Sequence, residues 1–364
     1  MWTRVNIKQI IIDLSLKVTG QPFTGDSSFY QLTDADWKDT LGLDSIELMG
    51  LAAAVNSFFN IFEIYNPPYL LSSTRIDDWV DMIYKVRQVN DEALIFHTSG
   101  TSGTAKITRH PLAYLEREIA FLGTLFSDAT CIVPYVASNS IYGFLFTVGL
   151  PRLLNIPVVY PSQVNWQQMP PQALIVATPF NWQFLLNTLP GAQMNCLGVS
   201  AAAPLYDILY QDILSKGISL TELYGSTETS GIGFRTHWEQ PFTLLPFWEF
   251  TAGNNVADRD GRAEFELMDE IDQLGPGKFK VTGRRDKQVK VAGKLVDMEA
   301  VTAQIKKMPN IAGCRLSAKA LGNDVIIQAE LALVDDGEQQ RAEIKKLIRT
   351  SLPAHEKPRD LYFS

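Results

Sequence analysis

The spacing of apolar residues changes twice along the chain and so divides it into three stretches. Up to about residue 88, apolar residues recur every three or four positions, which is the period of an amphipathic helix. This period predicts helices over 7–16, 45–59 and 76–86, the last one after the capping cluster Ser72-Ser73-Thr74. The first stretch is therefore predicted to be a compact all-α bundle.

From Ala93 onward, short apolar runs alternate with amphipathic segments, which is typical of a mixed α/β fold. A helix is predicted over 111–125, and buried strands are predicted over 93–96, 131–134, 158–160, 173–177, 196–200 and 218–220. The most apolar window, 141–160, contains Pro151, Arg152 and Pro157. A buried strand and loop is expected there, rather than a membrane span.

The pattern changes again at about Asp286. A helix over 298–308, two alternating strands over 313–320 and 324–333, and a second helix over 338–352 form an αββα sequence typical of a small α+β unit. The predicted domains are therefore a helical unit over 1–88, an α/β core over 91–285, and a small C-terminal unit over 286–364.

Composition limits the function classes. The 364 residues carry 32 Lys and Arg against 40 Asp and Glu, a net charge of -8, so a nucleic-acid partner is not expected. Three widely spaced cysteines argue against a disulfide framework or a metal site and fit a reducing cytoplasm. The N-terminus lacks the layout of a signal peptide. A cytoplasmic protein without a membrane span is expected.

The most informative segment is 96–106, Phe-His-Thr-Ser-Gly-Thr-Ser-Gly-Thr-Ala-Lys. Glycines let the backbone turn its N–H groups toward phosphate oxygens, hydroxyls add donors, and Lys106 adds a positive charge. The spacing is not that of a Walker A loop, because Gly103 and Lys106 are three residues apart and no Ser or Thr follows the lysine. The segment predicts a different kind of nucleotide phosphate site.

Two distant segments extend this interpretation, 221–228 (Thr-Glu-Leu-Tyr-Gly-Ser-Thr-Glu) and 283–294 (Gly-Arg-Arg-Asp-Lys-Gln-Val-Lys-Val-Ala-Gly-Lys). In this order and at these separations, the three segments resemble the signatures of the adenylate-forming ligases, the superfamily of acyl-CoA synthetases, peptide-synthetase adenylation domains and luciferases. The resemblance covers roughly 91–364. It implies distorted sheets with flanking helices and a small mobile C-terminal subdomain.

The resemblance implies an AMP-forming acid–thiol ligase, which activates a carboxylic acid with ATP and Mg²⁺, releases pyrophosphate and passes the acyl group to a thiol. In this family pattern Thr227 would hold the α-phosphate, Glu228 the Mg²⁺, and Tyr224 would stack near the adenine. The β- and γ-phosphates would be held by the loop residues Ser99, Thr101, Ser102, Gly103, Thr104 and Lys106.

The later signatures are assigned in the same way. Counting back from Gly277 and Gly283 selects Asp269 for the ribose hydroxyls, with Asp272 as the alternative. Arg284 would reach the ribose or phosphates, Asp286 would be the hinge of the C-terminal subdomain, and Gly293 would line a pantetheine tunnel. The acyl pocket would lie around 141–143, 200–204 and 224–229, where it could accept an aryl or fatty acid or where these residues could simply be packed core.

The helical unit contains a second motif, Leu41-Gly42-Leu43-Asp44-Ser45-Ile46-Glu47-Leu48-Met49. It resembles the attachment site of acyl and peptidyl carrier proteins, in which the serine carries 4′-phosphopantetheine. Ser45 would lie exposed at a helix N-terminus, where the dipole and free N–H groups favour a phosphodiester. The alternative is an ordinary Asp/Ser helix cap without chemistry. A carrier would imply a phosphopantetheinyl transferase and a downstream ketosynthase or acyltransferase as partners.

Two departures from the family are expected to matter. A large part of the N-terminal segment that usually precedes the phosphate loop is absent, and the chain stops before the segment that carries the family's final lysine. Without that lysine, adenylation is expected to be slower by a factor on the order of 10²–10³. The favoured interpretation is a ligase that loads its own carrier, in cis or in trans, in a polyketide or fatty-acid-like pathway. The alternatives are a ligase that delivers to free CoA and a non-catalytic carrier and docking protein.

Overall fold

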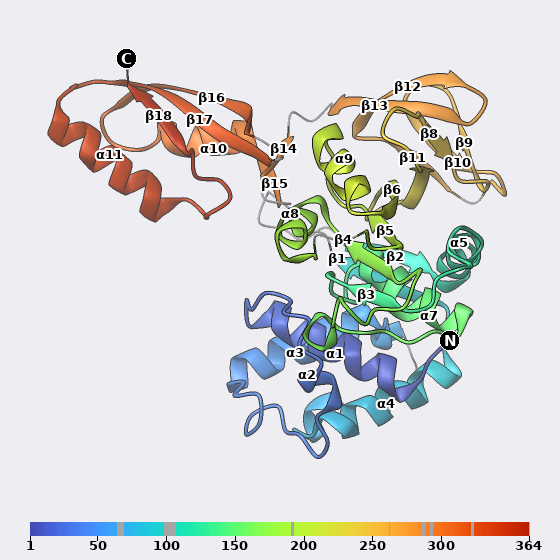
Figure 1. The fold of residues 1–364 in the computed structure, drawn as a ribbon. Coiled ribbons are helices and arrows are strands. Elements are labelled where there is room, and N and C mark those ends of the chain that lie inside the picture. The colour runs from blue at the N-terminus through green and yellow to red at the C-terminus, as the bar shows by residue number, and fades with distance from the viewer. Residues whose placement is uncertain are drawn as a thin grey trace.

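The computed structural model describes residues 1–63, 69–97, 107–190, 193–261, 263–284, 288–291, 294–321 and 324–363. Figure 1 shows the helical N-terminal part below a large sheet, and the C-terminal unit projecting to one side. Four helices and two short 3₁₀ turns form the described N-terminal part: α1 (Arg4–Val18), α2 (Ser28–Gln31), α3 (Ser45–Phe58), η1 (Ile61–Glu63), η2 (Leu70–Ser72) and α4 (Ile76–Val89). The three predicted helices are confirmed.

The large sheet has eight strands in the order β12-β13-β8-β7-β6-β5-β4-β3. From β3 to β6 neighbouring strands are parallel, and from β6 to β12 they are antiparallel. The strands are β3 (Ile132–Pro134), β4 (Leu174–Ala177), β5 (Cys196–Ser200), β6 (Ile218–Ser226), β7 (Ser230–Arg235), β8 (Phe242–Leu244), β12 (Asp269–Gly275) and β13 (Lys278–Arg284).

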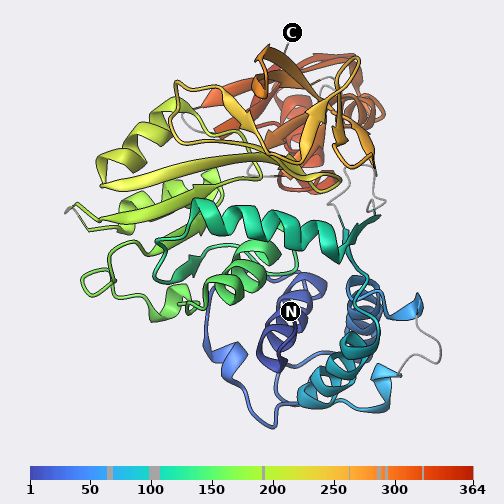
Figure 2. The ribbon, with the colours of Figure 1, turned by 90° about the vertical axis from the view of Figure 1, so that its right-hand side faces the viewer.

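Helices flank this sheet, and Figure 2 shows the N-terminal helices below α5 and the sheet. The flanking elements are α5 (Leu112–Leu125), α6 (Ile141–Phe144), the π-helical η3 (Leu145–Gly149), α7 (Leu150–Leu154), η4 (Pro161–Gln163), α8 (Pro179–Thr188) and α9 (Asp207–Ser215). A hairpin, β1 (Ala93–His97) and β2 (Ile107–Pro111), precedes α5, and a three-stranded sheet consists of β9 (Trp248–Phe250), β10 (Asn255–Asp258) and β11 (Glu264–Glu266).

The C-terminal unit has its own hydrophobic core, in which Ile305, Leu331 and Ile344 are buried. Its elements are β14 (Gln288–Val291), β15 (Lys294–Asp297), α10 (Met298–Lys306), β16 (Ile311–Leu321), β17 (Asp324–Leu333), α11 (Glu338–Ser351) and β18 (Asp360–Phe363). The αββα order is confirmed and extended, because β18 adds a third strand parallel to β17. Four residues are too few to show a period in the sequence.

One hydrophobic core joins the N-terminal helices to the α/β part. It runs from Trp2 and Ile10 on the helical side to Phe96, Phe144 and Val199 on the other. The centroid of the Trp2 ring lies 5.4 Å from that of Phe59 in the helical part and 6.0 Å from that of Phe144 in the α/β part, so an aromatic contact crosses the predicted boundary near residue 90. The helices therefore bury their apolar faces against the rest of the chain as well as against each other.

Two predictions for 141–160 are wrong. Residues 141–154 are helical rather than a strand and loop, because this apolar run packs between α5 and β3 and is buried on nearly all sides, which removes the amphipathic period. The predicted strand 158–160 is reduced to a single bridge between Ile132 and Val158, because Pro157 and Pro161 on either side cannot donate to a ladder.

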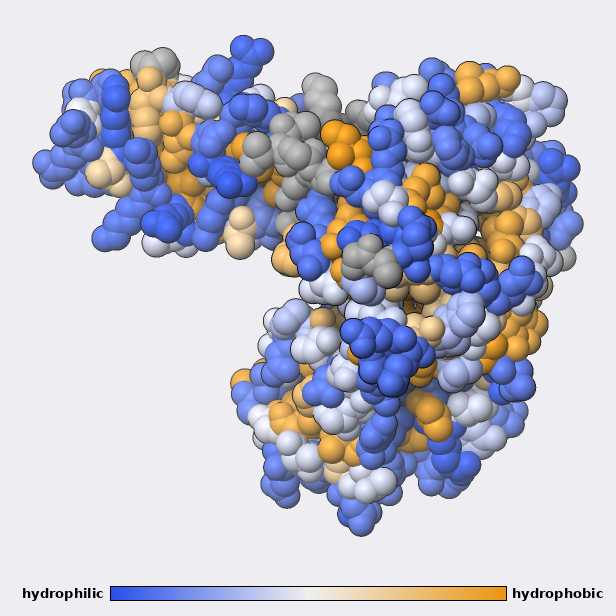
Figure 3. Space-filling view, in the orientation of Figure 1, coloured by the Kyte–Doolittle hydropathy of each residue, from blue (hydrophilic) through white to orange (hydrophobic). Residues whose placement is uncertain are grey.

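The face of the molecule in Figure 3 is mostly hydrophilic, with scattered apolar areas. Within the described residues, no helix combines the length and the apolar character that a bilayer crossing requires.

Candidate active site

The parallel half of the large sheet places several loops at one edge. Strands β3, β4, β5 and β6 run in the same direction, so the segments after Pro134, Ala177 and Ser200 and the end of β6 lie along their common carboxyl edge. In open α/β sheets ligands bind outside this edge. The predicted adenine, phosphate and metal residues Tyr224, Thr227 and Glu228 all lie at the end of β6 or directly after it.

Tyr224 and Asp269 are far apart in sequence but touch in the structure. The Tyr224 hydroxyl donates a 2.9 Å hydrogen bond to Oδ2 of Asp269, and the tyrosine ring packs against Phe242 and Phe279 at 5.8 and 5.6 Å between ring centroids. The structure thus joins the residue predicted for the adenine to the residue predicted for the ribose. Asp272, the alternative, lies three residues further along β12 opposite Lys280.

The Asp269 backbone is held in place by a neighbour that sequence reasoning did not single out. Nδ2 of Asn254 donates to the carbonyl oxygens of Asp269 and Leu267, at 2.5 and 2.8 Å. Across the hairpin Asp269 pairs with Arg284, so the backbones of these two predicted ribose residues are neighbours. Together with the bond from Tyr224 to Asp269, this register brings the second and third signature segments together at one corner of the sheet.

The turn that carries Thr227 and Glu228 is fixed by hydroxyl groups. Ser226 Oγ accepts the backbone N–H groups of Glu228 and Thr229 at 3.2 and 3.3 Å, and Thr229 Oγ1 accepts the Ser226 N–H at 3.3 Å. These bonds between serine and threonine side chains and nearby amides stabilise the turn locally. The hydroxyl of Thr227 and the carboxylate of Glu228 are oxygen donors of the kind that phosphate and Mg²⁺ require.

His110 on β2 connects this turn to the β1–β2 hairpin. Its Nε2 lies 2.6 Å from the carbonyl oxygen of Thr227, and burial lowers the pKa of the imidazole, so a neutral ring donates Nε2–H to that carbonyl. The hairpin's connecting segment contains the predicted phosphate loop. His110 was not singled out from the sequence, and this contact was therefore missed.

Glu118 supports the same turn from its other end. Its carboxylate accepts the Gly231 N–H at 3.0 Å, while the Trp248 indole N–H donates to the Gly231 carbonyl at 2.7 Å. Glu118 is only 3% exposed, and burial raises its pKa to about 7. The sequence did hold a signal, because Glu118 shares the apolar face of α5 with Leu115, Ile119 and Leu122.

Some predicted site residues cannot be placed. Of Arg284 only the backbone is described, and the remaining predictions for the phosphates, the hinge and the tunnel lie outside the described residues: Ser99, Thr101, Ser102, Gly103, Thr104, Lys106, Asp286 and Gly293. Their assigned roles stay predictions.

Ser45 is exposed at the first position of α3, as expected for either interpretation of its motif. The prediction of free N–H groups beside Ser45 is wrong. The Asp44 carboxylate accepts hydrogen bonds from the backbone N–H groups of Ile46 and Glu47 at 2.7 and 2.8 Å, and the Glu47 carboxylate accepts one from the Asp44 N–H at 2.9 Å. A phosphodiester on Ser45 would therefore meet two carboxylates that already cap the helix. The local geometry is that of a capping box.

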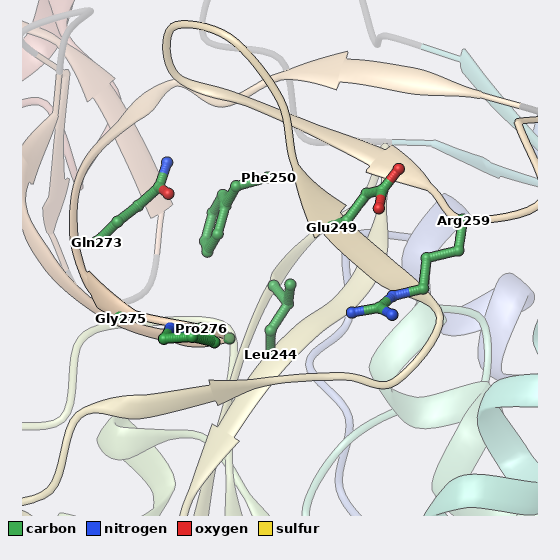
Figure 4. Close-up of a pocket in the computed structure, with 8 residues that line it drawn as sticks. Leu244, Glu249, Phe250, Arg259, Gln273, Gly275 and Pro276 are labelled. Carbon is green, nitrogen blue, oxygen red and sulfur yellow. The ribbon is translucent and has the colours of Figure 1, made fainter.

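Figure 4 shows a hollow elsewhere on the molecule, with a volume of about 530 Å³. It lies at the turn between β12 and β13, and none of the predicted site residues lines it. Its lining residues are Leu244, Glu249, Phe250, Arg259, Gln273, Gly275, Pro276 and Gly277.

Comparison with solved structures places this arrangement among known folds. The chain aligns with o-succinylbenzoate–CoA synthetase from Bacillus subtilis, bound to a product analogue, at a TM-score of 0.60 and 14% identity, over 75% of this chain and 66% of that one. A malonyl-CoA ligase with methylmalonyl-CoA and AMP bound aligns at a TM-score of 0.58 and 16% identity, over 75% of this chain and 71% of that one. The chain has the fold of the adenylate-forming ligases. The predicted mixed α/β class is confirmed.

Sequence relatives extend the similarity over nearly the whole chain. "4-Coumarate–CoA ligase" of Rhodobacter capsulatus is 29% identical over 356 residues, covering 94% of this chain and 89% of the relative. The protein of the same name from Halorhodospira halophila is 29% identical over 359 residues, covering 94% of this chain and 90% of the relative. No family profile matches the chain. These relatives confirm the prediction of an enzyme of the AMP-forming acid–thiol ligase class.

Proposed function

We propose that this chain activates an aromatic carboxylic acid with ATP and transfers the acyl group to the thiol of CoA. The observation that carries the proposal is the similarity to 4-coumarate–CoA ligases over 94% of the chain. The contact of Tyr224 with Asp269 supports it, because Asp269 also pairs with Arg284 and so links the signature segments 221–228 and 283–294 at one corner of the sheet. The substrate class follows the names of the relatives.

The described residues fit the proposed ATP site. Tyr224 presents a ring for the adenine and Asp269 a carboxylate that accepts hydrogen bonds from ribose hydroxyls. Thr227 offers a hydroxyl donor to the α-phosphate, and Glu228 a hard oxygen ligand to Mg²⁺, which would neutralise phosphate charge when bound. The turn that carries both residues is fixed before substrate arrives, so little reorganisation accompanies binding.

CoA is proposed as the acceptor instead of a carrier serine for two reasons. The match to the CoA ligases covers 94% of the chain, so it includes most of residues 1–88, where the carrier motif lies. These helices also share their core with the α/β part, through Trp2, Phe59 and Phe144 among others. A carrier that must move between partners needs a surface it can release, and a shared core does not provide one.

Transfer to Ser45-bound phosphopantetheine is the second candidate, because Ser45 is exposed at the start of α3. Ser57, twelve residues later in α3, lies 2.8 Å from Nε2 of His97, the residue directly before the predicted phosphate loop. Ser45 is thus about 18 Å from this contact along the helix axis.

An acceptor assay separates these functions. The chain is incubated with ATP, Mg²⁺ and a panel of aryl and fatty acids, with CoA in one arm and with prior phosphopantetheinyl-transferase treatment in the other. We expect acyl-CoA from an aryl acid in the first arm, at the same rate for the wild type and Ser45→Ala. An acyl mass on the intact wild-type chain that Ser45→Ala abolishes would instead establish the carrier function. Formation of neither product with any acid would contradict the proposed substrate class and acceptor.

A further inference from the structure

A buried carboxylate on the first helix has no role in the site described above. Asp13 of α1 is 1% exposed, and its side chain accepts three hydrogen bonds: from the Ser138 N–H at 2.7 Å, the Ser138 hydroxyl at 2.6 Å and the Tyr30 hydroxyl at 2.6 Å. Burial raises the pKa of Asp13 to about 6, and the bonds from Ser138 and Tyr30 oppose that rise. Near neutral pH the carboxylate is ionised and fully engaged.

Asp13 joins two segments that lie 125 residues apart. The backbone adds to the link, because the Asn139 amide nitrogen Nδ2 donates to the Asp13 carbonyl at 3.0 Å. On the far side, the Tyr30 ring stacks on Tyr160 at 4.4 Å between centroids. Charge-assisted bonds of this length inside a protein are among the stronger ones, so residues 138 and 139 are held firmly against α1.

The segment that Asp13 holds lies at the carboxyl edge of the sheet. Residues 135–140 directly follow β3, and the Tyr135 N–H donates to the Val176 carbonyl of β4 at 2.8 Å. Ser140 then caps α6, since its Oγ accepts the Gly143 N–H at 2.9 Å. The position of α6 therefore depends on where residues 138–140 lie.

α6 in turn spans the ends of two parallel strands. The Tyr142 hydroxyl lies 3.2 Å from the Ala177 carbonyl oxygen at the end of β4 and 3.0 Å from the Val199 carbonyl oxygen in β5. The fit is close, because a Cβ at Gly143 would come within 1.8 Å of the Ala137 carbonyl oxygen. A small displacement of residues 137–140 must therefore move α6 along the edge where ligands bind.

We propose that Asp13 is a positioning residue for acid recognition: it fixes residues 135–140, and through them it fixes α6 as a wall of the pocket that receives the carboxylic acid. The inference rests on the proposed function for the nature of the ligand. It gives the first helix, assigned by sequence to a separate carrier unit, a part in the ligase reaction. Asp13 acts through Ser138 and touches no substrate.

Asp13→Asn tests the proposal, because asparagine has the shape of aspartate but no charge. Its NH₂ group is itself a donor and would face the donor groups of Ser138 and Tyr30. We expect the KM for the acid to rise about tenfold while the KM for ATP stays within about twofold, since a displaced wall affects the acid alone. The preference among aryl acids of different size should also narrow or shift. Ser15→Ala is the matched control, because Ser15 is buried in the same helix and bonds only within it, to the Ile12 carbonyl.

A milder variant covers the case in which Asp13→Asn does not fold. Tyr30→Phe removes one of the three bonds and keeps the ring stacked on Tyr160, and should raise the KM for the acid about threefold with the KM for ATP unchanged. Folded variants that leave the KM for the acid unchanged, or that raise both KM values equally, would overturn the proposal.

Amide hydrogen exchange tests the same inference without catalysis. In Asp13→Asn, or in Tyr30→Phe where the former does not fold, exchange at residues 135–143 should increase relative to Ser15→Ala and the wild type. Unchanged exchange there would refute the positioning role. An inactive wild type with increased exchange in the variant would refute the proposed function, and the pocket assignment with it, while the structural role of Asp13 would stand.

Discussion

The hydroxyl of Tyr224 and the carboxylate of Asp269 meet at the proposed nucleotide corner. We predict that Tyr224→Phe, which keeps the ring packed on Phe242 and Phe279 but removes the 2.9 Å bond, raises the KM for ATP about threefold to tenfold and leaves the KM for the acid unchanged. Steady-state kinetics with each substrate varied in turn measures both values.

The matched control is Tyr210→Phe. Tyr210 is buried beside the same strand and donates a 2.6 Å bond to the Leu220 carbonyl, away from the corner. Loss of this bond should lower the stability of the fold and leave the KM for ATP unchanged relative to the KM for the acid. Equal kinetic effects of the two variants would show that Tyr224 is only a packing residue.

Glu118 should make stability depend on pH. Because its folded-state pKa of about 7 lies above its ordinary value of 4.5, the folded state binds the proton more tightly, and this stabilising contribution is complete below about pH 4.5 and is lost as the pH rises through 7. Glu118→Gln cannot ionise, so the stability of the variant minus that of the wild type should grow over this range by at most about 3 kcal/mol. Asp13 has a pKa shift of the same sign, but it is present in both proteins and cancels in the difference.

Urea unfolding of both proteins at several pH values between 4.5 and 8 measures this difference. Parallel stability curves would mean that Glu118 does not titrate in this range in the folded protein.

At the scale of elements, the β1–β2 hairpin and the turn after β6 are linked through His110. We predict that His110→Phe lowers kcat/KM for ATP about tenfold or more, because phenylalanine cannot donate a hydrogen bond to the Thr227 carbonyl. The phenylalanine ring would still fill the space beside Phe96. His110→Gln carries an amide N–H near the position of Nε2–H and should recover part of the loss.

The kinetic comparison of these two variants with the wild type is informative because the fold is changed little in either. If phenylalanine and glutamine at 110 are equally impaired, the hydrogen bond to the turn has no positioning role.

The elements that the sequence predicted well are those with one apolar face or a short fully apolar run. Helices α1, α3, α4 and α5 and strands β3, β4 and β5 appear within a few residues of their predicted bounds. The segment 141–154 was predicted incorrectly because it is buried on nearly all sides, so its apolar residues show no period that distinguishes a helix from a strand. Glu118 and His110 were missed because their partners are backbone groups of a turn more than 100 residues away, which no local pattern records.

At the scale of the whole molecule, the sequence predicted the order of the parts but not how the first two share a core. The change in the spacing of apolar residues near residue 90 does mark a change of secondary structure, since α4 ends there and β1 begins. However, Trp2 against Phe144, Gln9 against Thr147 at 3.0 Å and Asp13 against Ser138 tie the helices to the α/β part. Contacts between segments so distant in sequence become visible only in three dimensions.

This shared core predicts how fragments behave. A fragment of residues 1–88 should not unfold cooperatively, because its apolar surface loses the partners that cover it in the full chain. The full chain should lose the near-ultraviolet signals of the N-terminal and α/β parts in one transition. Circular dichroism of the fragment and chain over a urea series checks both statements. A fragment that unfolds cooperatively would restore the separate carrier unit as the better description.

The measurement that tests the central claim most directly is the product analysis of the full chain with ATP, Mg²⁺, CoA and 4-coumarate, by liquid chromatography and mass spectrometry. The account predicts 4-coumaroyl-CoA, or the CoA thioester of a related aryl acid when the panel is tried, together with one AMP for each thioester formed. ADP in place of AMP, or no thioester with any acid while CoA and ATP remain intact, would contradict it.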